Sequence, residues 1–153
     1  MSPHQQPVRA LRICVVENHS DTRHMLSVLL RQQGHELGLA ESCAAARALF
    51  DAEAFDVLIS DIAMPAEDGY MLIRRVRASA DERVRRTPSI AVTAHAGSAD
   101  RQRALDAGFD VHYAKPVDID ALVGTLVMMR AARDAADAST SGGGGGEGGE
   151  PAK

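Results

Sequence analysis

The chain has 153 residues, with 17 basic and 21 acidic side chains and a formal net charge of −4. This length fits one domain with a substantial core, and the acidic balance argues against the basic face that a nucleic-acid-binding protein presents. The sequence contains neither the apolar run of about 18 residues that a membrane span requires nor a signal peptide at its polar start. Two isolated cysteines without metal-ligand spacing indicate buried thiols in a reducing compartment, so we expect a cytoplasmic protein.

Composition divides the chain into three segments. Residues 1–9 form a polar arm with two prolines, which we expect to be flexible. Residues 10–134 carry the apolar periodicity of a folded domain. Residues 135–153 lose that periodicity and include a glycine-rich run, so we predict a disordered tail.

Short apolar runs alternate with amphipathic segments through residues 10–134. Strands are predicted at 11–16, 35–40, 57–59, 89–93 and 111–114. One helix is predicted after each strand, and the charged segment 80–87 is predicted as a loop. Five strands alternating with five helices predict an α/β fold: a flavodoxin-like, doubly wound parallel sheet with strand order 2-1-3-4-5 and helices on both faces.

The central stretch of the chain, residues 55–69, reads FDVLISDIAMPAEDG. Its apolar run is typical of a strand buried on both faces, and Pro65 and Gly69 mark the turn-rich segment that follows. Asp61 stands where that strand ends. The carboxyl ends of the strands are where open α/β sheets bind ligands, so Asp61 is a candidate functional residue.

Polar side chains stand at the ends of three other predicted strands. Together with the central aspartate, the set is Glu17, Asn18, Asp61, Thr93 and Lys115. In the strand order 2-1-3-4-5 the first and third strands are neighbours where the winding reverses, so Glu17, Asn18 and Asp61 should converge. Thr93 and Lys115 should approach Asp61 from the other side.

This set suits one chemistry. Carboxylate and carbonyl oxygens are ligands that Mg²⁺ prefers. An aspartate can act as a nucleophile and form an aspartyl phosphate, so Asp61 is the predicted phosphorylation site. Lys115 would balance the negative charge of the phosphoryl group, and Thr93 would donate a hydrogen bond to it.

The order of these residues resembles the response-regulator receiver domain of two-component signalling, over residues 11–130. The resemblance rests on short motifs that occur in order: Glu17-Asn18, then Asp61 followed by Met64-Pro65 and Asp68-Gly69, then Thr93-Ala94, and then Lys115-Pro116. The segment AGFDVHYAKPVDIDAL is further similar to receivers that are attached to hybrid histidine kinases or work with them.

The resemblance implies roles for these residues. Asp61 would accept phosphate from a phosphohistidine on a histidine kinase or a histidine phosphotransfer protein. The backbone carbonyl of Ala63 would join Glu17, Asn18 and Asp61 around Mg²⁺. Thr93 and His112 would be the switch pair, changing the face that residues 98–107, 111–114 and the last helix present to a downstream protein. The domain would be a phosphoacceptor and not a separate output enzyme.

Asn18 departs from the family pattern, because receivers carry an acidic residue there. Asparagine offers a carbonyl oxygen but no charge, so we expect weaker Mg²⁺ binding. The alternative is a degenerate receiver that acts as a phosphate-independent interaction module. A small-molecule phosphohydrolase is disfavoured, because Ala63 stands where an acid–base residue would be needed two positions after Asp61.

Several residues keep two interpretations. His112 replaces the usual aromatic switch residue and could swing towards Thr93 as an aromatic side chain would; it is either a neutral structural side chain or a pH-sensing one. His19 and His95 lie on loops that border the site. His95 and Ala63 stand two residues after Thr93 and Asp61, where receivers vary and tune the phosphate lifetime, and the alternative is that both histidines are simply solvent-facing. The arginines of 74–77 and 83–86 form either a solvated helix face, which we favour, or a contact for an acidic partner.

Overall fold

The computed structural model describes residues 10–94 and 97–149, so the predicted N-terminal arm, His95 and the last four residues lie outside the described part. The chain divides into two compact units, residues 1–117 and 118–153. None of the helices among the described residues combines the length and apolar character that a membrane span requires.

The first unit contains one parallel sheet of five strands. The strands are β1 (Arg12–Val16), β2 (Glu36–Ala40), β3 (Val57–Asp61), β4 (Ser89–Thr93) and β5 (Val111–Ala114). Their order is β2-β1-β3-β4-β5, as predicted, and every neighbouring pair is parallel. β3 is buried along its whole length and reaches Asp61, two residues beyond the predicted run. The central strand therefore carries the candidate nucleophile as its last residue.

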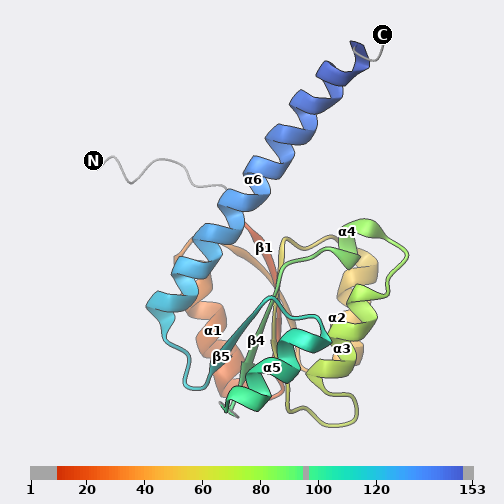
Figure 1. Ribbon diagram of the computed structural model, residues 1–153. Coiled ribbons are helices and arrows are strands. Elements are labelled where there is room, and N and C mark those ends of the chain that lie inside the picture. The colour runs from red at the N-terminus through yellow and green to blue at the C-terminus, as the bar shows by residue number, and fades with distance from the viewer. Residues whose placement is uncertain (1–9, 95–96, 150–153) are drawn as a thin grey trace, which may run out of the picture. The chain divides into compact units, whose positions relative to one another are not determined.

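Helices cover both faces of this sheet (Figure 1). They are α1 (Ser20–Gln32), α2 (Cys43–Ala52), α3 (Gly69–Arg77), α4 (Glu82–Arg85) and α5 (Ser98–Ala107). α1 lies on one face, and α2, α3 and α5 lie on the other. The fold class expected from the sequence is confirmed.

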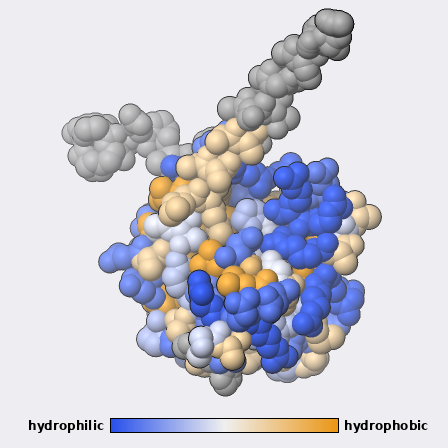
Figure 2. Space-filling view, viewed as in Figure 1, coloured by the Kyte–Doolittle hydropathy of each residue, from blue (hydrophilic) through white to orange (hydrophobic). Residues whose placement is uncertain are grey.

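Aliphatic packing makes the core, as the low aromatic content requires. One cluster joins alternate residues of β1, β3 and β4 to α2, α3 and α5, and includes Cys14, Leu58, Ala91, Leu72 and Ala104. Both cysteines are buried free thiols, as expected. Hydrophilic side chains cover much of the face shown in Figure 2, consistent with burial of the apolar residues in this cluster.

The segment 80–87 is not wholly a loop, because it contains the four-residue helix α4. The carboxylate of Asp81 accepts a hydrogen bond from the backbone N–H of Arg83 and so caps its start. Arg86 pairs with Glu82 one turn away, at 2.9 Å. Polar capping and ion pairing support this turn, whereas the prediction relied on apolar periodicity, which the segment lacks.

The arginine cluster is only partly the solvated face that we favoured. The guanidinium of Arg77 donates hydrogen bonds to the backbone carbonyls of Gly108, Arg85 and Thr87 at 2.7–2.9 Å. It also pairs with Asp110 at 3.0 Å. Arg77 therefore ties α3 to the end of α4 and to the turn that precedes β5.

The second unit is formed by α6 (Ile119–Gly149). Asp118 precedes it and accepts a hydrogen bond from the N–H of Ala121. The helix extends past residue 134, where the tail was expected to begin without regular structure. Alanines at 131–138 account for the first part of the extension because alanine is the strongest helix former, whereas nothing in the sequence accounts for its continuation through the glycine run.

Candidate phosphoacceptor and metal site

The predicted site residues of the first unit lie at the carboxyl edge of the sheet. Asp61 and Thr93 are the last residues of β3 and β4, and Glu17 and Lys115 directly follow β1 and β5. β1 pairs with β3 on one side, and β4 followed by β5 lies on the other, so Glu17 and Lys115 approach Asp61 from opposite sides. The convergence expected from the strand order is thus present.

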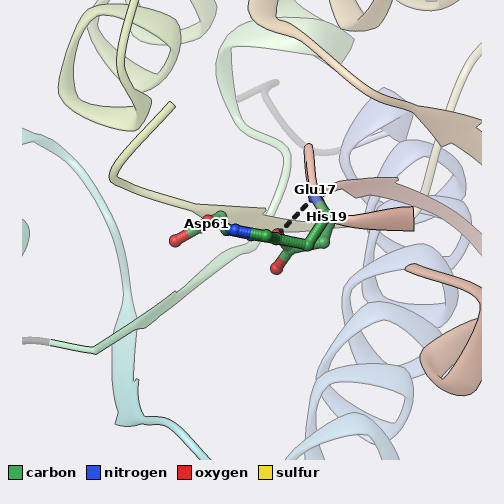
Figure 3. Close-up of side chains that lie close together, drawn as sticks. All are labelled: Glu17, His19 and Asp61. Carbon is green, nitrogen blue, oxygen red and sulfur yellow. Dashed lines mark hydrogen bonds and ion pairs between the residues drawn. The ribbon is translucent and has the colours of Figure 1, made fainter. Parts of the chain in front are cut away.

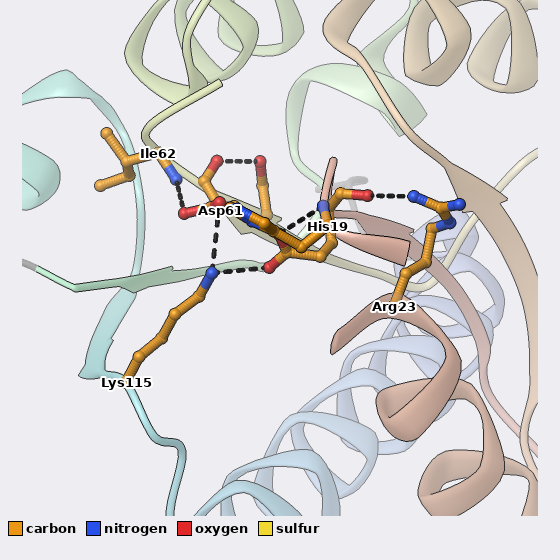
Figure 4. Close-up of polar contacts among 7 residues, drawn as sticks. His19, Arg23, Asp61, Ile62 and Lys115 are labelled. Carbon is orange, nitrogen blue, oxygen red and sulfur yellow. Dashed lines mark hydrogen bonds and ion pairs between the residues drawn. The ribbon is translucent and has the colours of Figure 1, made fainter. Parts of the chain in front are cut away.

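An ammonium group joins the two carboxylates (Figure 4). Lys115 Nζ donates to Glu17 Oε1 at 2.7 Å and lies 3.2 Å from Asp61 Oδ2. Glu17 and Asp61 are 2% and 4% exposed, while the side chain of Lys115 is 22% exposed. A buried carboxylate pair thus shares one cation that reaches solvent.

The second oxygen of Asp61 is held by the backbone. Asp61 Oδ1 accepts a hydrogen bond of 2.8 Å from the N–H of Ile62. The hydroxyl of Ser60 donates to the carbonyl of Asp61 at 2.7 Å. These bonds fix both the carboxylate and the peptide unit that follows it, and nothing in the sequence pattern pointed to the part played by Ser60.

The three ionisable groups shift one another's pKa. Burial raises the pKa of Asp61 above its usual value, and the negative charge of Glu17 adds to that effect. Burial also acts to raise the pKa of Glu17, but hydrogen bonds from Lys115 and from the His19 backbone lower it overall. Burial alone would lower the pKa of Lys115, but the hydrogen bond to Glu17 and the charge of Asp61 raise it. Lys115 and Glu17 are therefore charged at neutral pH, and Asp61 is the carboxylate that is easier to protonate.

The loop after β1 folds back on Glu17. The backbone N–H of His19 donates to Glu17 Oε2 at 3.1 Å, and Nδ1 of the same residue lies 3.2 Å from that oxygen. Arg23 in α1 donates to the backbone carbonyl of Glu17 at 2.7 Å. His19 is 70% exposed but contacts the site, so it is more than a solvent-facing loop residue. The contacts of His19 and Arg23 depend on the loop's path, which the sequence did not reveal.

The donor atoms fit a divalent metal ion. Carboxylate oxygens of Glu17 and Asp61 and a ring nitrogen of His19 lie within 4.8 Å of one another. Asn18 Oδ1 is buried and, among the described residues, has no hydrogen-bond partner, so this oxygen is available to a metal ion. Ala63, whose carbonyl was the fourth predicted ligand, is exposed two residues after Asp61. Oxygen ligands of this kind suit Mg²⁺.

The loop between β3 and α3 packs closely against the acidic strand end. The N–H of Gly69 donates to the carbonyl of Ile62 at 2.8 Å. A Cβ atom at Gly69 would lie 2.4 Å from the carbonyl oxygen of Asp61, so only glycine fits. Asp68 then starts α3 by accepting a hydrogen bond from the N–H of Met71 at 3.0 Å. The Asp68-Gly69 pair therefore closes the loop that follows Asp61.

The predicted switch residues lie on adjacent strands. Thr93 is buried at the end of β4, beside Ala114 of β5. His112 lies beside Ala91, and Tyr113 beside Val92, so the two side chains point to opposite faces of the sheet. Within the described part of the chain, Nε2 of His112 is buried and has no hydrogen-bond partner. His112 therefore lies on the face of the sheet that α5 covers, with Nε2 directed inward.

Comparisons with known proteins agree with this geometry. The sequence model of one family, the response regulator receiver domain, matches residues 13–127. A 14.6 kDa protein of Leptolyngbya boryana is 39% identical over 113 residues, which are 74% of this chain and 85% of that protein. The sensor histidine kinase RcsC of Salmonella typhi is 34% identical over 77% of this chain, but over only 12% of the kinase.

Solved structures show the same fold. A response regulator of Chloroflexus aurantiacus superposes with a TM-score of 0.75 and 27% identity, covering 80% of this chain and 99% of the other. The receiver domain of the sensor histidine kinase PA1611 of Pseudomonas aeruginosa superposes with a TM-score of 0.70 and 30% identity, over 77% and 95% of the two chains. That structure has a magnesium ion coordinated in its active site cleft.

Proposed function

Because this chain belongs to the response regulator receiver domain family of two-component signalling, we propose that Asp61 accepts a phosphoryl group from a phosphohistidine donor. The donor would be a histidine kinase or a histidine phosphotransfer protein. Two relatives are, or are part of, sensor histidine kinases, which supports this class of partner.

The observation that carries the proposal is the shared position of Lys115. Its ammonium lies between a buried nucleophile, Asp61, and a second carboxylate, Glu17, while it still reaches solvent. A phosphoryl group arriving at Asp61 brings negative charge to a site that already holds two carboxylates. Lys115 supplies a cation next to the atom where that charge develops.

The transfer requires little of the protein beyond positioning and charge balance. Asp61 Oδ2 attacks phosphorus, the P–N bond to the donor imidazole breaks, and the electron pair leaves with that nitrogen. Oδ1 stays held by the N–H of Ile62, which fixes the direction of attack. Oxygens of Glu17, Asn18 and Asp61 and the carbonyl of Ala63 would hold Mg²⁺, which would supply positive charge to balance the phosphoryl oxygens.

The signal would pass from the phosphoryl group to the surface of α5 and β5. Thr93 ends β4 beside the site, and its hydroxyl would donate a hydrogen bond to the phosphoryl group. Movement of Thr93 leaves space on the α5 side of the sheet, and the inward side chain of His112 would fill it. A downstream protein would recognise the changed face. The domain itself would act as a phosphoacceptor and would carry no separate enzymatic output.

A phosphate-independent receiver is the second candidate, and Asn18 is the observation that favours it. The oxygen of Asn18 is buried, but it contributes no charge to a metal. This candidate predicts binding to a partner without phosphorylation and without Mg²⁺.

Intact-mass spectrometry after incubation with acetyl phosphate and Mg²⁺ tests the choice between them. We expect a gain of about 80 Da, the mass of one phosphoryl group, that is absent in Asp61→Asn and retained in Asp51→Asn, a matched change of an exposed carboxylate on α2. No gain at any Mg²⁺ concentration would contradict the phosphoacceptor function and favour the second candidate. A gain retained in Asp61→Asn would contradict the assignment of the site.

A further inference from the structure

We infer that His19 is a direct metal ligand, so that this site prefers borderline divalent transition-metal ions over Mg²⁺. The inference rests on the metal site of the proposed function and concerns only which ion that site selects. Its basis is the position of the His19 side chain beside the carboxylates of Glu17 and Asp61.

The three donors lie close to the arrangement that an ion would impose. Figure 3 shows the side chains of Glu17, His19 and Asp61 together at the carboxyl edge of the sheet. Their ligand atoms all lie within 4.8 Å of one another. Two ligands on opposite sides of an ion, each bonded at about 2.1 Å, are about 4.2 Å apart. The donors must therefore move closer together before all three share one ion: a pair on opposite sides of it by up to about half an ångström, and an adjacent pair at the 4.8 Å limit by more.

The pair Glu17 and His19 already has the spacing of adjacent ligands. Glu17 Oε2 and His19 Nδ1 are 3.2 Å apart, and two ligands at right angles with bonds of about 2.1–2.2 Å are about 3 Å apart. Lys115 takes the other oxygen of Glu17, Oε1, so Oε2 faces the imidazole. The same oxygen also accepts the backbone N–H of His19, which holds the residue close.

The rest of the loop restrains Glu17 but leaves the imidazole accessible. Arg23 holds the backbone carbonyl of Glu17 from α1. The imidazole of His19 is 70% exposed, so an ion can reach it from solvent without opening the core. His19 is also the N-cap residue of α1 but makes no side-chain capping bond, so its ring is not needed to start the helix.

The chemistry of this ligand set sets the preference. Mg²⁺ is a hard ion that takes oxygen ligands and retains water, whereas imidazole suits borderline ions such as Co²⁺, Ni²⁺ and Zn²⁺. The position that would carry a second carboxylate is Asn18, so the chain lacks one of the charges that favour Mg²⁺. A neutral nitrogen donor adds a bond that benefits the borderline ions and leaves Mg²⁺ almost unaffected.

The test compares Co²⁺ and Mg²⁺ binding by isothermal titration calorimetry for the wild type, His19→Gln and His24→Gln. His24 is an exposed histidine on α1 and controls for adventitious imidazole binding. We expect His19→Gln to weaken Co²⁺ binding at least about tenfold, the smallest loss usual for residues that merely orient metal ligands. Mg²⁺ affinity should stay within about twofold, and His24→Gln should bind both ions as the wild type does.

A spectroscopic readout makes the test independent of phosphorylation. The proton NMR spectrum of the Co²⁺-loaded wild type should contain strongly shifted, non-exchangeable imidazole ring C–H resonances that disappear in His19→Gln. If the wild type binds both ions but the Co²⁺-loaded protein lacks these resonances, or if His19→Gln loses affinity for both ions equally, the role of His19 is overturned and the phosphoacceptor function still stands. Failure of the wild type to bind either ion would contradict both this inference and the metal dependence of the proposed function.

Discussion

The ammonium of Lys115 donates a hydrogen bond of 2.7 Å to Oε1 of Glu17, across 98 positions of the chain. Lys115 also lies 3.2 Å from Asp61, so one cation balances two buried carboxylates. The site is thus an ion network in which each charge stabilises another, and removing any member should alter both stability and chemistry.

The first prediction concerns Lys115→Met, which keeps the length of the side chain and removes its charge. Breaking a buried ion pair costs about 3–5 kcal/mol, and the partial exposure of Lys115 should reduce the loss here to about 2 kcal/mol. Urea denaturation at pH 7 without divalent ions, followed by circular dichroism, measures it. Arg86→Met, which removes an exposed ion pair of α4, is the control and should change stability little. Equal stability of Lys115→Met and wild type would contradict the network.

The second prediction is that Asp61→Asn stabilises the metal-free protein at pH 7. The pKa of Asp61 is raised from 3.8 by burial and by the charge of Glu17, so ionising it in the folded state costs free energy. Above pH 3.8 the unfolded chain loses this proton before the folded chain does. The free energy of unfolding therefore falls as pH rises through that window.

Urea denaturation of the wild type and Asp61→Asn across this pH range tests the sign. The difference between them should be largest at neutral pH and vanish as pH falls below 3.8, and saturating Mg²⁺ should reverse part of it by stabilising the wild type. A variant less stable than the wild type at pH 7 would show that Lys115 outweighs both burial and Glu17.

Strand ends were predictable from the sequence, but loop paths were not. Buried β-branched runs locate strands, and the strand order then brings Glu17, Asp61 and Lys115 together without any knowledge of side-chain conformation. The contacts of His19 with Glu17 and of Ser60 with the Asp61 carbonyl depend on rotamers and on the course of a short loop. Such contacts leave no periodic trace in a sequence.

Arg77 illustrates a second limit. Its position on α3 next to other arginines favours a solvated face, yet its guanidinium satisfies three backbone carbonyls contributed by other segments. Apolar spacing identifies which residues of a helix pack inward, whereas a long polar side chain can leave the same helix and bond to a neighbouring loop. Asp110, just before β5, forms an ion pair with Arg77, but the sequence does not indicate this pairing until the fold is known.

The third prediction concerns these hydrogen bonds of the Arg77 guanidinium. Arg77→Met should lower the free energy of unfolding by about 2 kcal/mol, because the partly buried carbonyls of Gly108 and Arg85 lose the guanidinium donor and that of Thr87 keeps only the Ser89 hydroxyl. Arg74→Met, on the exposed side of the same helix, should stay within about 0.5 kcal/mol of the wild type. Urea denaturation compares the two. If both variants lose the same free energy of unfolding, the hydrogen bonds of Arg77 to the three carbonyls do not stabilise the fold.

The fourth prediction is that neither thiol reacts in the folded protein. Burial raises the pKa of Cys14 to about 12. Burial, followed by a hydrogen bond to Glu67 and that residue's charge, raises the pKa of Cys43 to about 11. Since the thiolate is the reactive form, Ellman's reagent at pH 8 should detect almost no thiol in the native protein and two per chain in urea. Rapid native labelling would mean that α2 opens locally.

The fifth prediction joins the loop after β3 to the chemistry of Asp61. In Gly69→Ala, the new Cβ would meet the carbonyl oxygen of Asp61 at 2.4 Å and Cα of Ile62 at 2.8 Å, and both are backbone atoms that cannot rotate away. We expect a loss of about 1–3 kcal/mol in unfolding free energy, as for other overpacked sites. Phosphorylation by acetyl phosphate should slow, because the displaced peptide carries the N–H that orients Asp61 Oδ1.

Gly124→Ala is the control, at a helical position where the added Cβ would meet open space. Its free energy of unfolding should instead rise by about 0.5–1 kcal/mol. If Gly69→Ala were as stable and as readily phosphorylated as the wild type, the close approach of the loop to Asp61 would have no role in shaping the site.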